Sequence, residues 1–355
     1  MYHPIHVAQG VKYFWQSIKQ KINGPKKYKG TAQQICKQII QACWNGKYFQ
    51  TSTHHYKEFW ARDFGYCAES LIKLGYRKEV TKTLHYALQK YQETGIKTTI
   101  TEKGTPFSFP DLYSPDSVAL IIHAVRVLND KKLIKKYKRF LQAEIEAFAS
   151  IVLLDGKVRR HAHFSGMRDY ARHDSSCYTH CMAILIARDA KELGLRFPYT
   201  EKQLVKHLDD YWKGYYRDDR SNPEASGDAN TLPYWLGIGK DFTKSLTVIQ
   251  KHGLDNPFPL SYSSKPHTHM IPIEILVPGW QHDAIWPFLG FLWMQAVKKY
   301  QPELLKTYKQ QYDETIKHHG TLFEVYTISK KPYKSIFYHS DEGMLWAAIY
   351  LTTFS

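Results

Sequence analysis

Three segments that are far apart in the chain each place a carboxylate beside aromatic side chains. They are residues 59–64 (FWARDF), 113–117 (YSPDS) and 323–326 (FEVY). Aromatic rings cover the apolar faces of sugars, and two carboxyl groups can cleave a glycosidic bond. One carboxyl group protonates the leaving oxygen while the other activates a water. These residue types therefore predict carbohydrate cleavage.

The candidate catalytic pair is Asp116 and Glu324. Cleavage with inversion requires two carboxyl groups on opposite sides of the sugar, roughly 6.5–9.5 Å apart. Asp116 follows Phe107, Phe109 and Tyr113, and aromatic, poorly hydrated surroundings raise the pKa of a carboxyl group so that it can stay protonated. Each residue also has a simpler interpretation. Asp116 can be a helix-start carboxylate that interacts with the helix dipole, and Glu324 can be an exposed acid in a loop.

The segment 59–64 has the residue types of a sugar-holding site. Arg62 and Asp63 are adjacent and can bind neighbouring hydroxyl groups, while Trp60 or Phe64 covers the sugar face. The alternative is a local salt bridge at a helix start. The segment 278–287 (PGWQHDAIWP) contains the further candidates for the pocket wall, which are Trp280, Gln281, His282 and Trp286.

Two other polar segments are either capped helix starts or additional pocket walls. The first, 227–231, contains Asp228 and Asn230, and the second, 172–175, contains Arg172 and Asp174. The residues alone leave both interpretations open.

Composition indicates one large folded domain. The chain has 355 residues, of which 43% are hydrophobic and 15% aromatic, and no linker-like or low-complexity run divides it, so we predict a single domain over 1–355. The first residues do not have the pattern of a signal peptide, and no apolar run is long enough for a membrane span. The five cysteines lack C-x-x-C spacing, which predicts reduced core thiols. We expect a cytoplasmic protein without a membrane partner.

The formal charge is +16 and the pI is about 9.4. Basic proteins can bind nucleic acid or other polyanions. Here the lysines are scattered as short pairs and form no single basic stripe, which favours a solvated surface. We therefore expect no specific nucleic-acid partner, and the oligomeric state stays open.

The sequence lacks the motifs of several other chemistries. The 18 histidines include no H-E-x-x-H, and neither a phosphate-binding loop, a dinucleotide fingerprint nor a G-x-S-x-G elbow is present. We expect no catalytic metal and no cofactor.

A helical period of apolar residues dominates the chain. It predicts helices near 8–20, 30–44, 63–75, 77–94, 115–128, 131–152, 175–193, 200–213, 241–252, 282–299, 302–316 and 339–353. Strand signals are short, at 96–101, 156–159 and 271–276. Longer connections fall at 45–62, 96–114, 153–174, 214–232, 253–281 and 317–338. About twelve helices joined in this way fit a closed ring of helical hairpins, in which alternate connections emerge on one face.

Four motifs in this order resemble a known group of glycosidases. Arg62-Asp63-Phe64, Asp116-Ser117, Trp280…His282…Trp286-Pro287 and Glu324-Val325-Tyr326 look like the alkaline/neutral invertases and the amylo-α-1,6-glucosidases of glycogen debranching. Trehalases and glucoamylases are more distant members of the same group. The resemblance covers roughly residues 55–350 and implies an all-α (α/α)6 barrel.

The resemblance also implies roles for the matching residues. Arg62 and Asp63 would hold the terminal glucose, Asp116 would be the general acid and Glu324 the general base. His282 and Trp286 would form the pocket wall. The sequence departs from the group at 281–284 and at 168–175, so the sugar and the leaving group stay open.

The resulting hypothesis is an inverting glycoside hydrolase that acts on a small α-glucoside or on the end of a short α-glucan. One rival is a degenerate barrel that binds carbohydrate without cleaving it. A second rival is a helical scaffold that binds polyanions through its positive charge.

Overall fold

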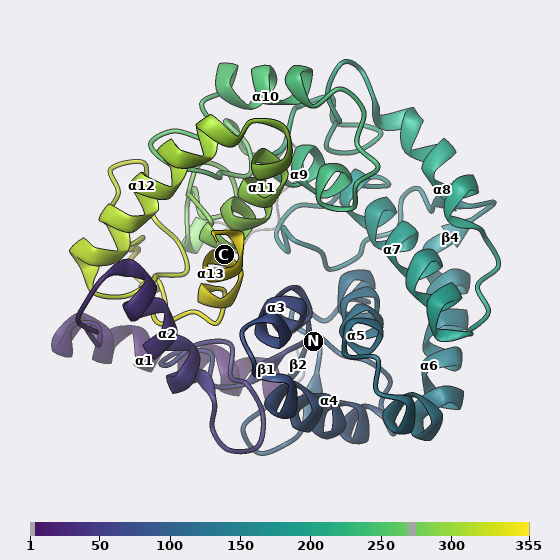
Figure 1. Ribbon diagram of the computed structural model, residues 1–355, viewed down its shortest axis with the longest axis horizontal. Helices are drawn as coiled ribbons and strands as arrows, with labels where there is room; N and C mark the ends of the chain where they lie inside the picture. Colours follow the sequence, from purple (N-terminus) through teal and green to yellow (C-terminus); the bar gives the residue numbers. More distant parts are fainter. Residues whose placement is uncertain (1–3, 268, 270–274, 355) are drawn as a thin grey trace.

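The computed structural model describes residues 4–267, 269 and 275–354, and its helices form two concentric rings (Figure 1). Contacts between successive inner helices, and between the last and the first, close the inner ring. The inner helices are α3 (Ala61–Lys73), α5 (Pro115–Leu128), α7 (Cys177–Leu193), α9 (Gly227–Trp235), α11 (Pro287–Tyr300) and α13 (Ala347–Thr353). The outer helices are α2 (Ala32–Cys43), α4 (Arg77–Tyr91), α6 (Lys131–Val152), α8 (Glu201–Leu208), α10 (Phe242–Lys251) and α12 (Pro302–His319).

Each outer helix precedes an inner helix in the chain, so the fold is an (α/α)6 barrel of six helical hairpins, as predicted. Helix α1 (Pro4–Asn23) precedes the ring. The strands are short. β1 (Phe59–Trp60), β2 (Thr99–Ile100) and β3 (Pro106–Phe107) form an antiparallel sheet in that order, and β4 (Leu153–Leu154) pairs with β5 (Lys157–Val158). A 3₁₀ turn, η1 (Asp209–Tyr211), follows α8.

The two rings differ in how their helices are buried. Nearly every residue of α5 is buried, which is expected for a helix enclosed on all sides. In α6 the buried side chains recur every three or four residues, as in a helix with one apolar face. Gly65 permits the close contact of α3 with α5, because a Cβ there would lie 2.4 Å from the Cβ of Leu120.

All the long connections run from an outer helix to the next inner helix, and they therefore lie on one face of the barrel. The start of each inner helix, which is the positive end of its dipole, points toward these connections. Short turns join each inner helix to the next outer helix. Local signals fix these boundaries: Pro115 is the first residue of α5, Thr200 and Gln203 form a capping box on α8, and Gly194 ends α7 in a left-handed conformation.

The predicted count of helices agrees with the fold partly by coincidence. The predicted helix at 8–20 is α1, which is outside the ring, and the predicted connection 214–232 contains the start of α9 at Gly227. The strand signals at 96–101 and 156–159 correspond to β2 and β5, while residues 271–274 of the third lie outside the described residues.

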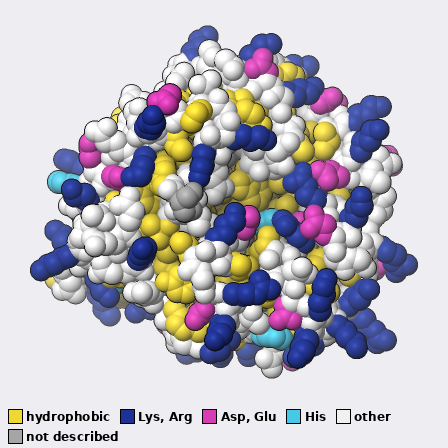
Figure 2. Space-filling model, in the orientation of Figure 1, with side chains coloured by type: hydrophobic (Ala, Val, Ile, Leu, Met, Phe, Trp, Pro, Cys, Tyr) yellow, Lys and Arg dark blue, Asp and Glu magenta, His cyan; other side chains and the backbone are white. Residues whose placement is uncertain are grey.

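Several sequence expectations on composition can be compared with the structure. The five cysteines are buried and free, as predicted. Among the described helices, none combines the length and the apolar character that crossing a bilayer would need. Lysine and arginine side chains are spread over the face seen in Figure 2 and form no single stripe there.

Candidate active site

A cavity of about 150 Å³ lies among the long connections at the starts of the inner helices. On the order of ten waters would fit in this volume, which is room for one sugar ring and a water. The residues that line it are Tyr13, Thr51, Tyr56, Trp60, Arg62, Asp63, Phe109, Met167, Asp169, Tyr170, Tyr262, Val277, Trp280, Gln281, Trp286, Phe288, Glu324, Tyr338, Met344 and Trp346.

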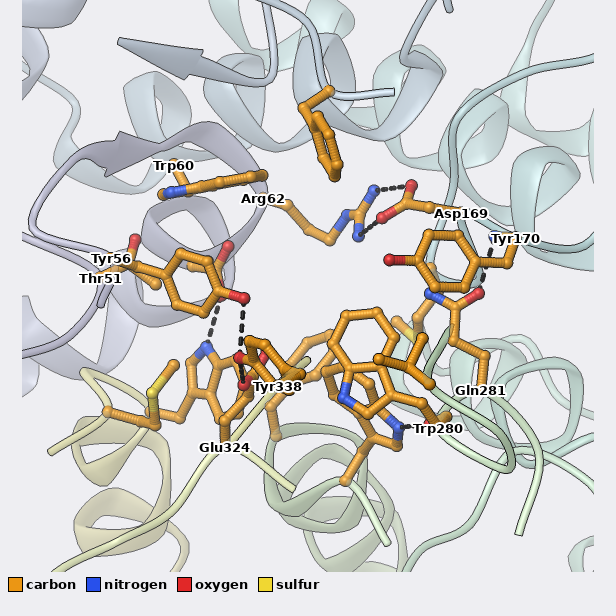
Figure 3. A pocket seen from close by; sticks show the side chains of 18 of the residues that line it. Thr51, Tyr56, Trp60, Arg62, Asp169, Tyr170, Trp280, Gln281, Glu324 and Tyr338 are labelled. Carbon is orange, nitrogen blue, oxygen red and sulfur yellow. Dashed lines mark hydrogen bonds and ion pairs between the residues drawn. The ribbon is translucent and has the colours of Figure 1, made fainter. Parts of the chain in front are cut away.

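Arg62, at the start of α3, joins two carboxylates, of which Figure 3 shows Asp169. Its Nε donates to Asp116 Oδ2 at 2.6 Å, and the two terminal nitrogens donate to Asp169 at 3.1 and 3.5 Å. The ion pairs with Asp116 and Asp169 raise the pKa of Arg62 against the opposing effect of burial. Arg62 is therefore a fixed cation in the wall of the cavity.

The structure corrects the prediction that Asp116 faces the pocket. Asp116 lies behind Arg62, is fully buried and is not among the residues that line the cavity. Its oxygens accept from Arg62, from Ser114 Oγ at 2.6 Å and from Tyr178 Oη at 2.9 Å. A carboxylate with three donors and no access to the cavity positions Arg62 and does not reach a glycosidic oxygen.

Asp169 is a cavity carboxylate that the sequence reasoning missed. Its Oδ1 accepts from Ser165 Oγ at 2.7 Å and from Arg62. Among the described residues, Oδ2 has only the 3.5 Å contact with Arg62. Burial raises the pKa of Asp169, although Arg62 opposes the shift. A signal was present, because Asp169 is followed by Tyr170 within a long connection. The same criterion, an acid beside an aromatic residue, selected the other segments.

Glu324 lies on the opposite side of the cavity from Asp169 (Figure 3). Its Oε2 accepts from the Tyr338 hydroxyl and from the Asp341 backbone nitrogen at 3.3 Å. Oε1 makes no hydrogen bond with the described residues. Burial, together with the nearby Asp341 and Asp63, raises the pKa of Glu324 to about 8, and the Tyr338 hydroxyl opposes this shift.

Asp63 adds a third carboxylate to the cavity. Burial raises its pKa to about 6, while Arg62 and the indole of Trp346 oppose the shift. Trp346 Nε1 donates to Asp63 Oδ1 at 2.8 Å. Asp63 also contributes to the raised pKa of Glu324, so these two acids belong to the same side of the site.

Aromatic rings form much of the remaining wall. The ring of Trp280 lies 4.9 Å from that of Trp286, 5.3 Å from Tyr170 and 5.6 Å from Tyr338, between centroids. The indole nitrogens of Trp60 and Trp280 and the hydroxyl of Tyr13 are buried and have no hydrogen-bond partner within the described part of the chain. Buried donors of this kind require partners, and the hydroxyl groups of a sugar would supply them.

Gln281 is held so that its amide nitrogen can reach a ligand. Its Oε1 accepts from the backbone nitrogen of Tyr170 at 2.7 Å, and no contact of its Nε2 with the described residues competes. Together with Trp60, Arg62, Asp63, Trp280, Trp286 and Glu324, Gln281 is one of the predicted site residues that line the cavity.

Other predicted site residues lie elsewhere. Phe64 is buried in the core with its ring 5.3 Å from that of Phe59, and His282 lies outside the cavity with its Nδ1 3.3 Å from Asp283. Asn230 holds the backbone of Tyr216 through both atoms of its amide. Phe64 and Asn230 share a reason, because each lies near the start of an inner helix, where one side chain points into the cavity and the next points back into the core.

The polar segments that the sequence left open belong to other cavities. Asp228 lines a small separate cavity, with an oxygen 3.9 Å from Arg168. Arg172 and Asp174 line a third cavity beside several histidines. The stretch from Arg168 to Asp174 therefore divides its side chains among three cavities.

Two groups of described residues bring potential metal ligands within 4.8 Å of one another, and they are His54–His55–Asp341 and His173–Asp218–His267. In the second group Arg168 donates to His173 Nε2 at 2.9 Å and to Asp218, so a guanidinium already occupies the position of a cation. In the first, the oxygens of Asp341 accept from the backbone nitrogens of His55 and Tyr56 at 2.9 and 3.0 Å. We assign both groups a role in loop structure.

The arrangement combines carboxyl groups with raised pKa values, one fixed cation and unpartnered donors in an aromatic cavity. Asp169 and Glu324 face each other across the space in which a sugar ring fits. Two carboxyl groups on opposite sides of a sugar are what a reaction needs in which one protonates a leaving oxygen and the other orients a water.

Neither the family models nor the curated proteins contain a match to this chain. Solved structures do match. A rhamnosidase from Klebsiella oxytoca with rhamnose bound aligns with a TM-score of 0.64 at 11% identity, over 92% of this chain and 64% of that one. This chain thus spans less than two thirds of the rhamnosidase.

A GH63 mannosylglycerate hydrolase from Thermus thermophilus, in complex with Tris and D-glycerate, aligns with a TM-score of 0.62 at 13% identity. That alignment covers 90% of this chain and all of the other. An uncharacterized conserved protein from the same organism aligns with a TM-score of 0.64 at 12% identity, over 90% of this chain and all of the other. At these identities the likeness shows the fold, which is that of six-hairpin glycosidases.

Proposed function

We propose that the protein is an inverting glycoside hydrolase that removes one sugar unit from a small glycoside. The observation that carries the proposal is the pair Asp169 and Glu324, which line one aromatic cavity from opposite sides and have raised pKa values. Structural scaffolds rarely keep two such groups around an open space, whereas hydrolases need them.

In this proposal Asp169 is the general acid, in place of Asp116, and Glu324 is the general base. Glu324 acts as the base in its ionised form, which predominates above a pH of about 8. Glu324 is fixed through Oε2 by Tyr338 and Asp341, so Oε1 can accept a hydrogen bond from the attacking water. Asp169 Oδ2 has the weaker contact with Arg62 and can carry the proton for the leaving oxygen.

The remaining cavity residues bind the sugar. Trp60 and Trp280 supply ring faces and unpartnered indole nitrogens, and the amide nitrogen of Gln281 can donate to a hydroxyl group. Arg62 and Asp63 are adjacent, so together they can bind neighbouring hydroxyl groups of the sugar. The sequence resemblance suggests an α-glucoside, while two of the structural neighbours act on rhamnosides and on mannosylglycerate, so all three sugars belong in the test.

The test is proton NMR of the sugar released from a panel of sucrose, trehalose, maltose, isomaltose, glucosylglycerate, mannosylglycerate and an α-rhamnoside. Release of one sugar with its anomeric configuration inverted, abolished in both Asp169→Asn and Glu324→Gln, supports the proposal. Sugar binding that raises the melting temperature without any release, in the wild type and in both variants, would instead assign the cavity to a non-catalytic carbohydrate-binding barrel.

A further inference from the structure

Helix α1 has the reverse of the usual orientation of a surface helix. Its buried residues are polar, namely His6, Ser17 and Gln20. Five of its apolar side chains face solvent at helical spacing, and their exposed fractions are 59% for Val7, 51% for Val11, 38% for Phe14, 57% for Trp15 and 77% for Ile22. A surface helix normally buries its apolar stripe, so this stripe is available for another surface.

Polar contacts attach α1 to the barrel. Gln20 Nε2 donates to Glu342 Oε2 at 2.9 Å, and His6 Nε2 lies 2.6 Å from the carbonyl oxygen of Ser108. Lys12 forms an ion pair with the buried Glu58. The helix is thus held in place by polar side chains and by Tyr13, whose ring lies 5.1 Å from that of Tyr56. The exposed apolar side chains lie on another side of the helix.

The connection between α12 and α13 extends the apolar stripe. Ile336 is 82% and Phe337 45% exposed, and the ring of Phe337 lies 6.4 Å from that of Phe14. Lys21 Nζ donates to the backbone oxygens of Ser335 and Ile336, each at 3.0 Å. We call the combined patch the α1 surface, and it consists of Val7, Val11, Phe14, Trp15, Ile22, Ile336 and Phe337.

The charges beside the α1 surface are positive. Helix α1 contains no aspartate or glutamate, and its Lys19 and Lys21 are exposed. The neighbouring connection adds the exposed lysines Lys330, Lys331 and Lys334 just before Ile336. An occupant of this patch must therefore offer an apolar layer bordered by negative charge.

We propose that the α1 surface docks on the surface of an anionic lipid bilayer. Trp15 and Phe14 would lie at the boundary between headgroups and acyl chains, as aromatic side chains of interfacial helices do. The surrounding lysines would attract anionic headgroups. A second copy of this chain is a poorer occupant, because it would place the same lysines against one another.

Docking would also bring the cavity close to the bilayer. Tyr13, on the other side of α1, lines the cavity, and Tyr338 follows Phe337 directly. The inference is independent of the proposed catalysis, because it depends only on exposed side chains of α1 and of the connection before α13. If the protein has no glycosidase activity, the inference of bilayer docking is therefore unaffected.

The test is cosedimentation of the full chain with vesicles of phosphatidylcholine, with or without phosphatidylserine. We expect binding to the vesicles that contain phosphatidylserine, and weaker binding at high salt because screening reduces the attraction of the lysines. Trp15→Gln should lower the partition coefficient roughly tenfold, since a large apolar side chain no longer enters the bilayer. Leu154→Gln is the matched control, because Leu154 is also 57% exposed but lies on β4.

Three results would overturn the proposal. One is that the protein cosediments with neither kind of vesicle. Another is wild-type binding by both Trp15→Gln and Phe14→Gln, with circular dichroism showing that both variants are folded. The third is a dimer in sedimentation velocity, without lipid, that Trp15→Gln dissociates, because that result would assign the patch to a second copy.

Discussion

Glu324 should make the stability of the protein depend on pH in a way that Glu324→Gln removes. In the folded state burial raises the pKa of this carboxyl group from 4.5 to about 8. The native state therefore keeps a proton that the unfolded chain releases between these two values. The stabilising contribution of Glu324 is complete below pH 4.5 and is lost as the pH rises through about 8.

The size of the effect follows from the same two values. Their difference corresponds to on the order of 5 kcal/mol, which is an upper bound because a buried site can relax when it becomes charged. A glutamine side chain at this position would have nearly the same shape and cannot ionise. We expect Glu324→Gln to match the wild type at pH 4.5 and to be more stable than the wild type by several kcal/mol (~3–5) above pH 8.

The assay is urea unfolding, followed by tryptophan fluorescence, of the wild type and the variant across this pH range. Other ionisable groups, such as Asp63, are present in both proteins and largely cancel in the difference. Glu93→Gln is the control, because Glu93 is exposed on the surface. If the free energies of unfolding of the wild type and of Glu324→Gln change in parallel with pH, Glu324 is not a protonated buried acid and the reasoning fails.

Three further predictions concern the reaction. Asp169→Asn should lower turnover of a natural glycoside by about 10²–10⁴-fold but spare a glycosyl fluoride, whose leaving group needs no proton; equal losses on both substrates would contradict the acid role. Tyr338→Phe removes a donor that lowers the pKa of Glu324, so the break in the kcat/KM profile that Glu324 sets, expected near pH 8 in the wild type, should move to higher pH; an unmoved break would mean that another group sets it. Asp116→Asn breaks a buried ion pair, so it should lower the free energy of unfolding by about 3–5 kcal/mol. It should reduce the turnover of the glycoside and of the glycosyl fluoride equally. A loss of turnover on the glycoside alone would instead identify Asp116 as the general acid.

Much of the fold was predictable because it depends on local patterns. The helical period located the outer helices and most of the inner ones, and the lengths of the connections predicted that one face carries the site. The helical period did not locate α9, because this helix is short, contains Pro233 and is buried nearly throughout. Its one sequence signal was the segment 227–231, for which a capped helix start was one of the two interpretations, and α9 does begin there. The predicted count of twelve was reached only because α1 has a helical period.

The site was harder to predict because it depends on the direction of single side chains. Asp63 and Asp116 both lie in the first turn of an inner helix, yet only Asp63 lines the cavity. One helical residue corresponds to a rotation of about 100°, so an error of a single position exchanges an inward side chain for one that points at a neighbouring helix. Such an error is smaller than the uncertainty of a boundary read from sequence.

The grouping of buried acids with raised pKa values around one cavity is the strongest physical argument for function. Asp189 is fully buried between α5 and α7, but it accepts from His123 at 2.8 Å and from Arg126 at 2.9 Å, so its charge is compensated. Asp218 is also buried, and Arg168 and nearby histidines lower its pKa against the effect of burial. In the cavity the effect of burial is larger than that of the hydrogen-bond and ion-pair partners, so the pKa values of Asp63, Asp169 and Glu324 are raised. Burial also raises the pKa values of Glu58 and Glu342, which do not line the cavity. A raised pKa alone therefore does not mark the site, and what indicates function is that three such acids surround one sugar-sized space.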